Sequence, residues 1–256
     1  GHSLTDTYHA YPVWPGLYPL ALIGLVGWGR FKSEKSTIPG STMEWRWNNK
    51  AQYDQPDARH DISNWELLVT TEGNNAGIQW DGQWLKTWTD HAWQNGNRGK
   101  GAPTMLYTHW SDTGYANGNP EAPEPNFNTK WREQLDLDER GWLAKVDQVN
   151  DDLLDGCPPV YIIPGNRIMA RLFDDIAAGK QPMGIDNMAD YFIDNVHPNE
   201  LGAYAITCAV LLSIHHIEPK KLPYDLSQPD YRIPRTPTRD QAEYLQQVAL
   251  EVVTSY

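Results

Sequence analysis

Three polar side chains near the two ends of the chain have the residue types that nucleophilic catalysis needs. Ser3 lies in the sequence GHSL near the start, and Asp194 and His197 lie in the sequence DNVHP near the end. Acyl transfer requires a nucleophile, a base that removes its proton and an acid that orients the base. Each residue alone has an ordinary interpretation, because a serine before a helix commonly caps it and an aspartate commonly caps a turn. Together the three predict acyl-transfer chemistry.

The elements that must position these residues follow an alternating pattern. Short apolar or β-branched runs predict strands at Trp65–Thr71, Pro103–Thr108 and Val160–Ile163. Apolar spacing and capping residues predict helices at Asp81–Trp93, Lys130–Leu154, Ile168–Ala178, Asn199–His215 and Thr238–Val253. Strands that alternate with long helices imply a parallel sheet covered on both faces. The predicted fold class is therefore α/β, a three-layer α/β/α sandwich in which functional groups gather at the carboxyl ends of the strands.

No internal repeat or low-complexity linker divides the chain, so we expect a single domain over residues 1–256. Its last part, residues 219–256, combines a proline-rich segment with the terminal helix. Two long aromatic stretches, Ser41–Asn64 and Trp110–Asn128, are predicted to be loops without regular structure that build a substrate wall. The residues expected to contact substrate are Trp45, Trp47, His109 and Trp110.

Composition excludes several classes of function. The 256 residues include 33 acidic and 21 basic side chains, a net charge of −12, which argues against binding to nucleic acid or to anionic lipid. The longest nearly apolar run, Leu17 to Trp28, has 12 residues, whereas a helix that spans a bilayer needs about 20. The 12 Trp and 13 Tyr against 4 Phe suit either a sugar-binding cleft or a tryptophan-rich core.

Cysteine and histidine spacing gives no sign of a metal site. Cys157 and Cys208 are too few for a disulfide scaffold, and either one disulfide or two free thiols fits them. His91 and the pair His215–His216 have no partners at metal-ligand spacing. The glycine-rich stretch 96–101 precedes a strand and does not open a helix, so it does not resemble a phosphate-binding loop. We therefore expect neither a metal nor another cofactor.

The two motifs resemble those of a known family, the SGNH-type (GDSL-like) hydrolases. The sequence GHSL is similar to the first block of that family, with Ser3 as the nucleophile. The sequence DNVHP is similar to its fifth block, with Asp194 as the acid and His197 as the base. The blocks occur in the order of the family across nearly 200 residues. The resemblance implies a flavodoxin-like sandwich and a serine-hydrolase mechanism.

Two further blocks of the family have looser counterparts. The sequence STIPG offers Gly40 for the glycine of the second block. The sequence EGNN offers Asn74 for the asparagine of the third block, with Asn75 as the alternative, because that block usually reads Gly-x-Asn-Asp. The resemblance implies that the backbone N–H groups of Ser3 and Gly40 and an asparagine amide hold the oxyanion.

The resulting expectation is a serine esterase that removes small acyl groups, above all acetyl, from a carbohydrate through an acyl-enzyme. Its substrate would be a small-molecule or polysaccharide acyl ester, and the mean hydropathy of −0.62 fits such a partner better than a lipid. The alternatives are a glycan-binding protein on the same fold without catalysis, and an O-acyltransferase or lipase of the same family. We expect no membrane insertion, and a periplasmic or secreted location in preference to a cytoplasmic one.

Overall fold

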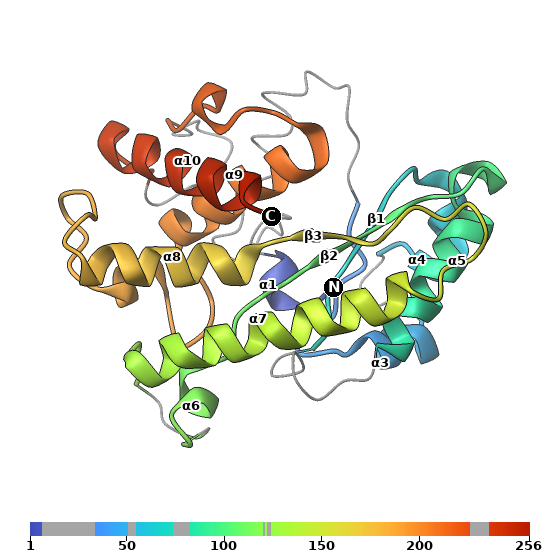
Figure 1. Ribbon diagram of the computed structural model, residues 1–256, viewed down its shortest axis with the longest axis horizontal. Coiled ribbons are helices and arrows are strands. Elements are labelled where there is room, and N and C mark those ends of the chain that lie inside the picture. The colour runs from blue at the N-terminus through green and yellow to red at the C-terminus, as the bar shows by residue number, and fades with distance from the viewer. Residues whose placement is uncertain (7–33, 51–54, 74–81, 120, 122–123, 226–235) are drawn as a thin grey trace.

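The structure is a computed structural model that describes residues 1–6, 34–50, 55–73, 82–119, 121, 124–225 and 236–256 (Figure 1). Within these residues a three-stranded sheet has the order β1-β2-β3, formed by β1 (Leu68–Thr70), β2 (Thr104–Tyr107) and β3 (Tyr161–Ile163). Both pairs of neighbouring strands are parallel. Each strand lies inside its predicted range, and the predicted α/β class is confirmed.

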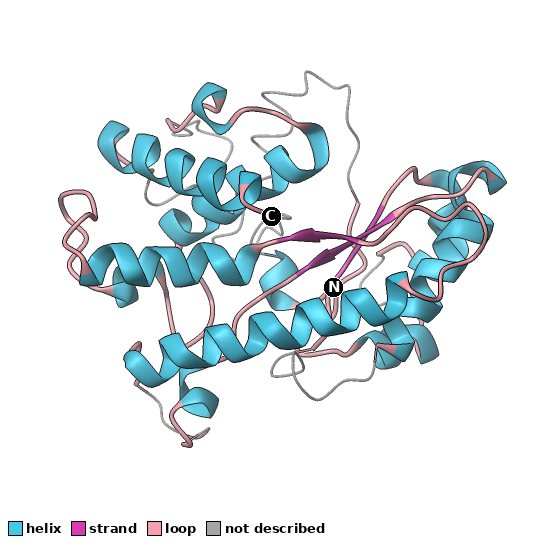
Figure 2. Ribbon diagram, in the orientation of Figure 1, coloured by secondary structure: helices cyan, strands magenta, loops and turns pink. Residues whose placement is uncertain are grey.

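The helices account for most of the described chain (Figure 2). The α-helices are α1 (Ser3–Asp6), α3 (Met43–Asn48), α4 (Ala58–Asp61), α5 (Gln83–Gly99), α6 (Thr113–Ala116), α7 (Thr129–Asn150), α8 (Gly165–Ala177), α9 (Glu200–His215) and α10 (Arg239–Thr254). Single 3-10 turns are η1 (Ile62–Asn64), η2 (Met188–Tyr191) and η3 (Pro219–Lys221). The five predicted helices correspond to α5, α7, α8, α9 and α10.

Side-chain caps explain where the long helices begin. The Asn199 side chain accepts the N–H groups of Leu201 and Gly202 at the start of α9. Thr238 and Gln241 form a reciprocal capping box at the start of α10. Such caps satisfy N–H groups that have no partner within the helix, and each contributes about 1 kcal/mol. Helix α9 therefore begins immediately after the segment that contains His197.

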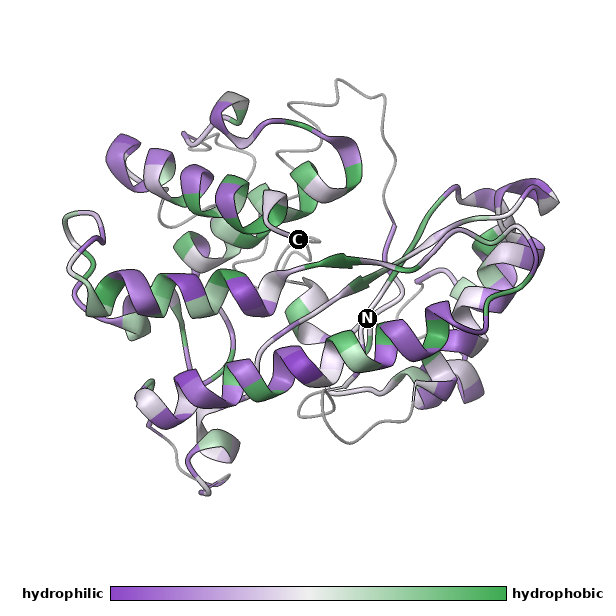
Figure 3. Cartoon of the chain, viewed as in Figure 1, coloured by the Kyte–Doolittle hydropathy of each residue, from purple (hydrophilic) through white to green (hydrophobic). Residues whose placement is uncertain are grey.

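Alternate residues of the strands face two different hydrophobic clusters. Met105 and Tyr107 of β2 face a cluster that includes α8, α9 and α10, which gather on one side of the sheet in Figure 1. Leu106 faces a second cluster that includes Met43 of α3 and Trp142 of α7. Parts of β2 and β3 are coloured as hydrophobic in Figure 3. Tyr161 at the start of β3 is exposed, whereas all four residues of β2 are buried, as expected for a strand covered on both faces. Burial of each such side chain contributes about 1.5–3 kcal/mol.

Two regions that were predicted to be structureless loops contain helices, so that prediction was wrong. The stretch 41–64 forms α3, α4 and η1, and the stretch 110–128 contains α6. The reason is local capping: the side chains of Thr42, Asp57 and Asp112 each accept an N–H from the first turn of the helix that follows. These caps start helices in both stretches, although the second is rich in glycine, asparagine and proline.

Cys157 and Cys208 are both free thiols, so the alternative of a disulfide between them is excluded. Burial within α9 raises the pKa of Cys208 far above its ordinary range, which makes this thiol unreactive. In the part of the chain that the structure describes, no helix is both long and apolar enough to cross a bilayer.

Candidate functional site

Ser3, His197 and Asp194 form a row of hydrogen bonds although 194 positions separate the first two. Ser3 is the first residue of α1, and the other two lie in the loop before α9. The distance from Ser3 Oγ to His197 Nε2 is 2.9 Å, and that from His197 Nδ1 to Asp194 Oδ2 is 2.7 Å. A neutral imidazole with its proton on Nδ1 donates to the carboxylate and accepts the serine hydroxyl proton at Nε2.

Backbone N–H groups of the loop that contains Asp194 and His197 hold the Asp194 carboxylate in place. Asp194 Oδ1 accepts the N–H groups of Val196 at 2.8 Å and His197 at 2.6 Å. Burial opposes ionisation of this carboxyl, but the two N–H groups and the imidazole outweigh it and hold the pKa of Asp194 below its ordinary value. Asp194 is therefore an ionised acceptor that orients the ring of His197.

The segment of residues 110–113 contacts the loop that contains Asp194 and His197. The indole N–H of Trp110 donates to Val196 O at 2.8 Å, and the N–H of Thr113 donates to Asn195 O at 3.1 Å. Trp110 is fully buried, and its N–H group is already used. The expectation that Trp110 contacts substrate therefore does not hold: the residue holds the Asp194–His197 loop in place.

The segment that contains Gly40 lies beside the segment that contains Ser3. Gly1 N donates to Ser36 O at 2.8 Å, and the N–H of Ile38 donates to Gly1 O at 3.1 Å. A turn follows in which Ser41 N donates to Ile38 O at 3.1 Å and Gly40 has a φ of +69°. A side chain is strained at that φ, so the turn favours glycine at this position. The structure thus brings the segment containing Gly40 next to the segment containing Ser3.

The third predicted segment begins at the same edge of the sheet. Asn74 and Asn75 lie outside the described residues, but Glu72 and Gly73 directly precede them after β1. The carbonyl of Glu72 lies 2.5 Å from His2 Nε2. His2 Nδ1 accepts the N–H of Leu4 at 3.3 Å, so the ring proton is on Nε2 and donates to Glu72 O. The end of β1 is therefore tied to the residue directly before Ser3.

His109 is buried beneath the site and does not face a ligand. Its Nε2 lies 3.1 Å from Glu72 O and its Nδ1 lies 3.1 Å from Trp110 O. Its ring packs edge-on against His2, with ring centroids 4.8 Å apart. Burial lowers the pKa of His109, so the ring is neutral and donates to one of the two carbonyls. The expectation that it contacts substrate does not hold, because backbone and aromatic groups enclose it.

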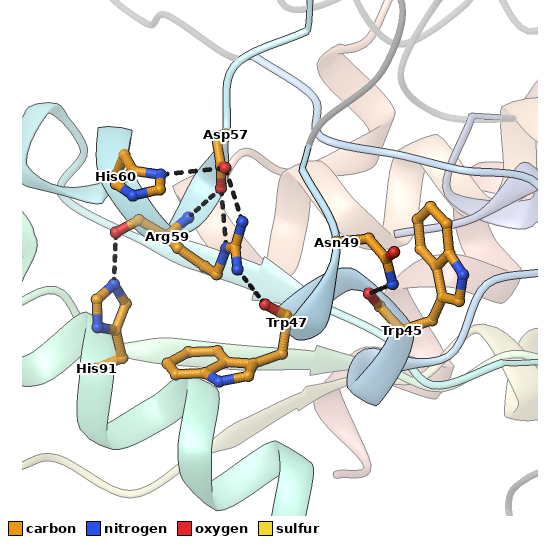
Figure 4. A network of polar contacts seen from close by, with 7 residues as sticks. All are labelled: Trp45, Trp47, Asn49, Asp57, Arg59, His60 and His91. Carbon is orange, nitrogen blue, oxygen red and sulfur yellow. Dashed lines mark hydrogen bonds and ion pairs between the residues drawn. The ribbon is translucent and has the colours of Figure 1, made fainter.

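The other two aromatic candidates differ from each other. Trp47 packs edge-on against Trp88 and His91, with centroids 5.1 and 5.2 Å away, and Figure 4 shows its carbonyl accepting from Arg59. Trp47 is therefore part of a structural aromatic cluster. Trp45 is half-buried and lines a shallow hollow with residues 36 and 38 of the segment that contains Gly40. Of these two residues, Trp45 is the one that lines the hollow beside the segment containing Gly40.

Asp112 is a carboxylate near the site that the sequence reasoning missed. It is half-buried, and its Oδ1 accepts the N–H of Gly114 at 2.6 Å at the start of α6. Burial raises the pKa of Asp112, and the nearby charge of Asp194 raises it further. In the sequence, the pattern Asp-Thr-Gly at residues 112–114 indicates that Asp112 caps a helix. It does not indicate that Asp112 lies near His197.

The arrangement has the parts of an acyl-transfer site. A serine hydroxyl is hydrogen-bonded to an imidazole, and an ionised carboxylate is hydrogen-bonded to the other nitrogen of that ring. Two further backbone segments lie beside the segment that carries the hydroxyl. Within the described ranges, no group of three or more His, Cys, Asp or Glu side chains is placed to hold a metal ion.

No model of a known protein family matches this sequence, and no curated protein matches it. Among solved structures, a DUF4886 family protein from Bacteroides uniformis ATCC 8492 has a TM-score of 0.55 at 15% identity, covering 99% of this chain and 92% of that chain. A lipase/acylhydrolase from Enterococcus faecalis has a TM-score of 0.43 at 16% identity, covering 87% of this chain and 94% of that chain. The first likeness shows a fold shared with the DUF4886 family protein.

Proposed function

We propose that the protein is a serine esterase in which Ser3 is the nucleophile, His197 the base and Asp194 the acid. The observation that carries this proposal is the unbroken row of hydrogen bonds from Ser3 Oγ through the imidazole to the Asp194 carboxylate. A binding protein has no need of a hydroxyl placed on an oriented imidazole, whereas acyl transfer depends on one.

In the first step Ser3 Oγ bonds to the carbonyl carbon of the ester while its proton moves to His197 Nε2. The imidazolium, stabilised by Asp194, then gives this proton to the oxygen of the departing alcohol as the acyl–oxygen bond breaks. Water attacks the acyl-enzyme in the second step and loses its proton to the same Nε2, which returns that proton to Ser3 Oγ when the carboxylic acid is released.

The negative charge that develops on the carbonyl oxygen needs donors that are already in place. We propose that these are the backbone N–H groups of Ser3 and Gly40 and the side-chain amide of Asn74, with Asn75 as the alternative. Loss of one such donor typically lowers kcat by about 10²–10³. The pairing of Gly1 with Ile38 supports the placement of the first two donors.

We further propose that the substrate is an acylated, above all acetylated, carbohydrate and that the whole chain is one three-layer sandwich. The half-buried Asp112 carboxylate suits the hydroxyl groups of a sugar better than a hydrocarbon chain. Trp45 offers a half-exposed aromatic face, a surface that is apolar with one polar group. The O-acyltransferase alternative differs from this esterase in the acceptor of the acyl group, and the lipase alternative differs in the acyl chain. The glycan-binding alternative differs in having no turnover.

The first test is labelling of the folded protein with a fluorophosphonate, followed by mass spectrometry of the modified peptide. We expect one adduct, on Ser3, which is lost in Ser3→Ala and retained in Ser255→Ala, a control at the end of α10 whose hydroxyl donates to Val252 O. Ser3→Ala should also lower kcat on acetyl esters by about 10⁴–10⁶, with an unchanged unfolding temperature. A folded parent protein without an adduct on Ser3 contradicts the proposal and favours the glycan-binding alternative.

A further inference from the structure

A buried arginine lies where the three segments of the site meet. Arg46, in α3, is 8% exposed as a residue. Its Nη1 donates to Gly1 O at 3.1 Å, to Ser41 O at 2.7 Å and to Ser41 Oγ at 3.0 Å. Its Nη2 donates to Thr71 O. One side chain thus binds the backbone of three segments that are far apart in the sequence.

Each of these carbonyls belongs to a segment that carries a part of the proposed site. Gly1 precedes the nucleophile by two residues, Ser41 directly follows Gly40, and Thr71 directly follows β1. Carbonyl oxygens carry partial negative charge, so a buried cluster of three of them is unfavourable without a donor between them. A guanidinium, with five N–H groups in a rigid plane, can satisfy several acceptors at once, whereas an ammonium is a point charge.

Glu72 also links α3 to the segment that follows β1, but as a hydrogen-bond acceptor, whereas Arg46 is a donor. Its buried carboxylate oxygen Oε1 accepts the N–H groups of Met43 at 2.8 Å and Gly73 at 2.7 Å. Burial lowers the pKa of Arg46 to about 10, and the charge of Glu72 opposes that shift. The guanidinium therefore remains charged at neutral pH, and a cation and an anion together join α3 to the end of β1.

We propose that Arg46 is a positioning residue that holds the segments of Ser3 and Gly40 and the end of β1 at the spacing that oxyanion stabilisation requires. This inference rests on the proposed function. Donors to an oxyanion act through preorganisation, and a shift of a few tenths of an ångström in a supporting segment weakens them. Arg46 touches neither Ser3 Oγ nor His197, so its loss acts on transition-state stabilisation and not on the proton transfer.

The test compares Arg46→Lys and Arg46→Met with a matched control, Arg59→Met. Arg59 is a half-buried arginine that binds the carbonyl of Trp47 and both carboxylate oxygens of Asp57 (Figure 4), but it contacts none of the three segments. Steady-state kinetics with p-nitrophenyl acetate, thermal unfolding and the pH profile of kcat are measured for all variants. Arg46→Lys keeps a charge in the core and serves as the decisive variant if Arg46→Met does not fold.

We expect kcat of Arg46→Lys to fall by about 10–100-fold, which is less than or equal to the loss of one oxyanion donor. KM should stay within about threefold, and the pH at which activity is half-maximal should not move, since the Ser3–His197–Asp194 row is intact. Arg59→Met should lose unfolding temperature to a similar degree while kcat stays within about threefold. A loss of kcat in Arg46→Lys, together with an unchanged kcat in an equally destabilised Arg59→Met, would show that Arg46 acts on the site and not only on the stability of the fold.

Two results would overturn this inference. A folded Arg46→Lys protein with the parent kcat, or with a change in kcat no larger than that of Arg59→Met, overturns it alone, provided that the parent shows turnover that depends on Ser3. Absence of such turnover in the parent overturns the proposed function and the inference with it. Because Ser3→Ala is assayed in the same series, the two failures are distinguishable.

Discussion

Two regions that contain histidines differ in environment: one contains His197, and the other contains His2 and His109. The side chain of His197 is 25% exposed and lies between a hydroxyl and a carboxylate. His2 and His109 are 0% and 2% exposed, and each approaches the carbonyl of Glu72. A carboxylate stabilises an imidazolium, whereas a buried carbonyl among aromatic rings does not compensate for its desolvation. The surroundings, and not the residue type, distinguish the two buried rings at the Glu72 carbonyl from the ring that lies between a hydroxyl and a carboxylate.

The two buried histidines, His2 and His109, have a structural role because their rings are neutral. Burial lowers the pKa of both rings, and for His2 the repulsion that a protonated His109 would exert and the charge of Arg46 lower it further. Each neutral ring has one N–H group to donate. The ring of His2 donates to the carbonyl that follows β1 and the ring of His109 packs against it, whereas the side chain of His197 is partly exposed.

The largest expected effect comes from removing the charge beside His197. Asp194→Asn should lower kcat by about 10⁴, equivalent to about 5 kcal/mol, because an amide neither stabilises the imidazolium nor selects the required tautomer. The Asn oxygen can still accept the N–H groups of Val196 and His197, so unfolding temperature should change little. Kinetics on an acetyl ester and a melting curve check both expectations.

The matched control is Asp190→Asn in the neighbouring turn η2, whose carboxylate accepts the N–H groups of Asp186 and Asn187. It should keep kcat within about threefold of the parent. If Asp194→Asn lost no more activity than this control, His197 would not depend on its carboxylate partner, and the contrast between the two histidine regions would fail.

An intermediate effect is expected at Trp110, which connects the two regions. It directly follows His109 in the sequence, and its indole N–H binds the carbonyl beside His197. Trp110→Phe removes buried volume and leaves Val196 O without its donor, so the free energy of unfolding should fall by about 2–4 kcal/mol. Because the Asp194–His197 loop loses a support, kcat should fall by about tenfold as well.

Trp131→Phe sharpens this test, because Trp131 is equally buried and its indole N–H donates to Ser111 O at 2.8 Å. Urea unfolding should show similar losses of stability in the two variants, with kcat of Trp131→Phe within about threefold of the parent. Equal losses of kcat would mean that Trp110 acts through stability alone.

The smallest effect concerns the pH dependence of stability at the buried histidines. Their folded-state pKa values lie below the ordinary value of 6.5, so below that pH the unfolded chain binds more protons than the folded one. Each ring therefore removes stability as the pH falls from 6.5 towards its folded pKa, by at most about 1.4 kcal/mol per pH unit. Burial raises the pKa of Glu72 and Asp138, which acts in the opposite direction.

His109→Gln isolates the contribution of one ring, because the amide still donates to a carbonyl but does not titrate. The difference in unfolding free energy between parent and variant should shrink as urea unfolding is repeated from pH 7.5 down to pH 5.5. Parallel curves for the two proteins would show that the pKa of His109 is the same in the folded and unfolded states, which contradicts the lowering by burial.

Several features of the fold were predictable because they depend on neighbours in the sequence. The strand runs ending at Thr71, Thr108 and Ile163 and the caps Asn199 and Thr238 depend on side chains within a few residues of one another. The two aromatic stretches were misread as loops since single capping residues decide short helices such as α3. Their tryptophans were expected at a surface, yet burial depends on what packs against a ring from elsewhere in the chain.

The sequence alone fixes the residue types of Ser3, Asp194 and His197 and the α/β pattern that brings such residues to one edge of a sheet. The tertiary structure decided which histidine lies on Ser3, that Trp110 supports a loop, and that Arg46 binds three backbone segments. The physical reason is that periodicity and capping are local, whereas convergence of carbonyls from Gly1, Ser41 and Thr71 on one guanidinium exists only after the sheet and its helices have packed.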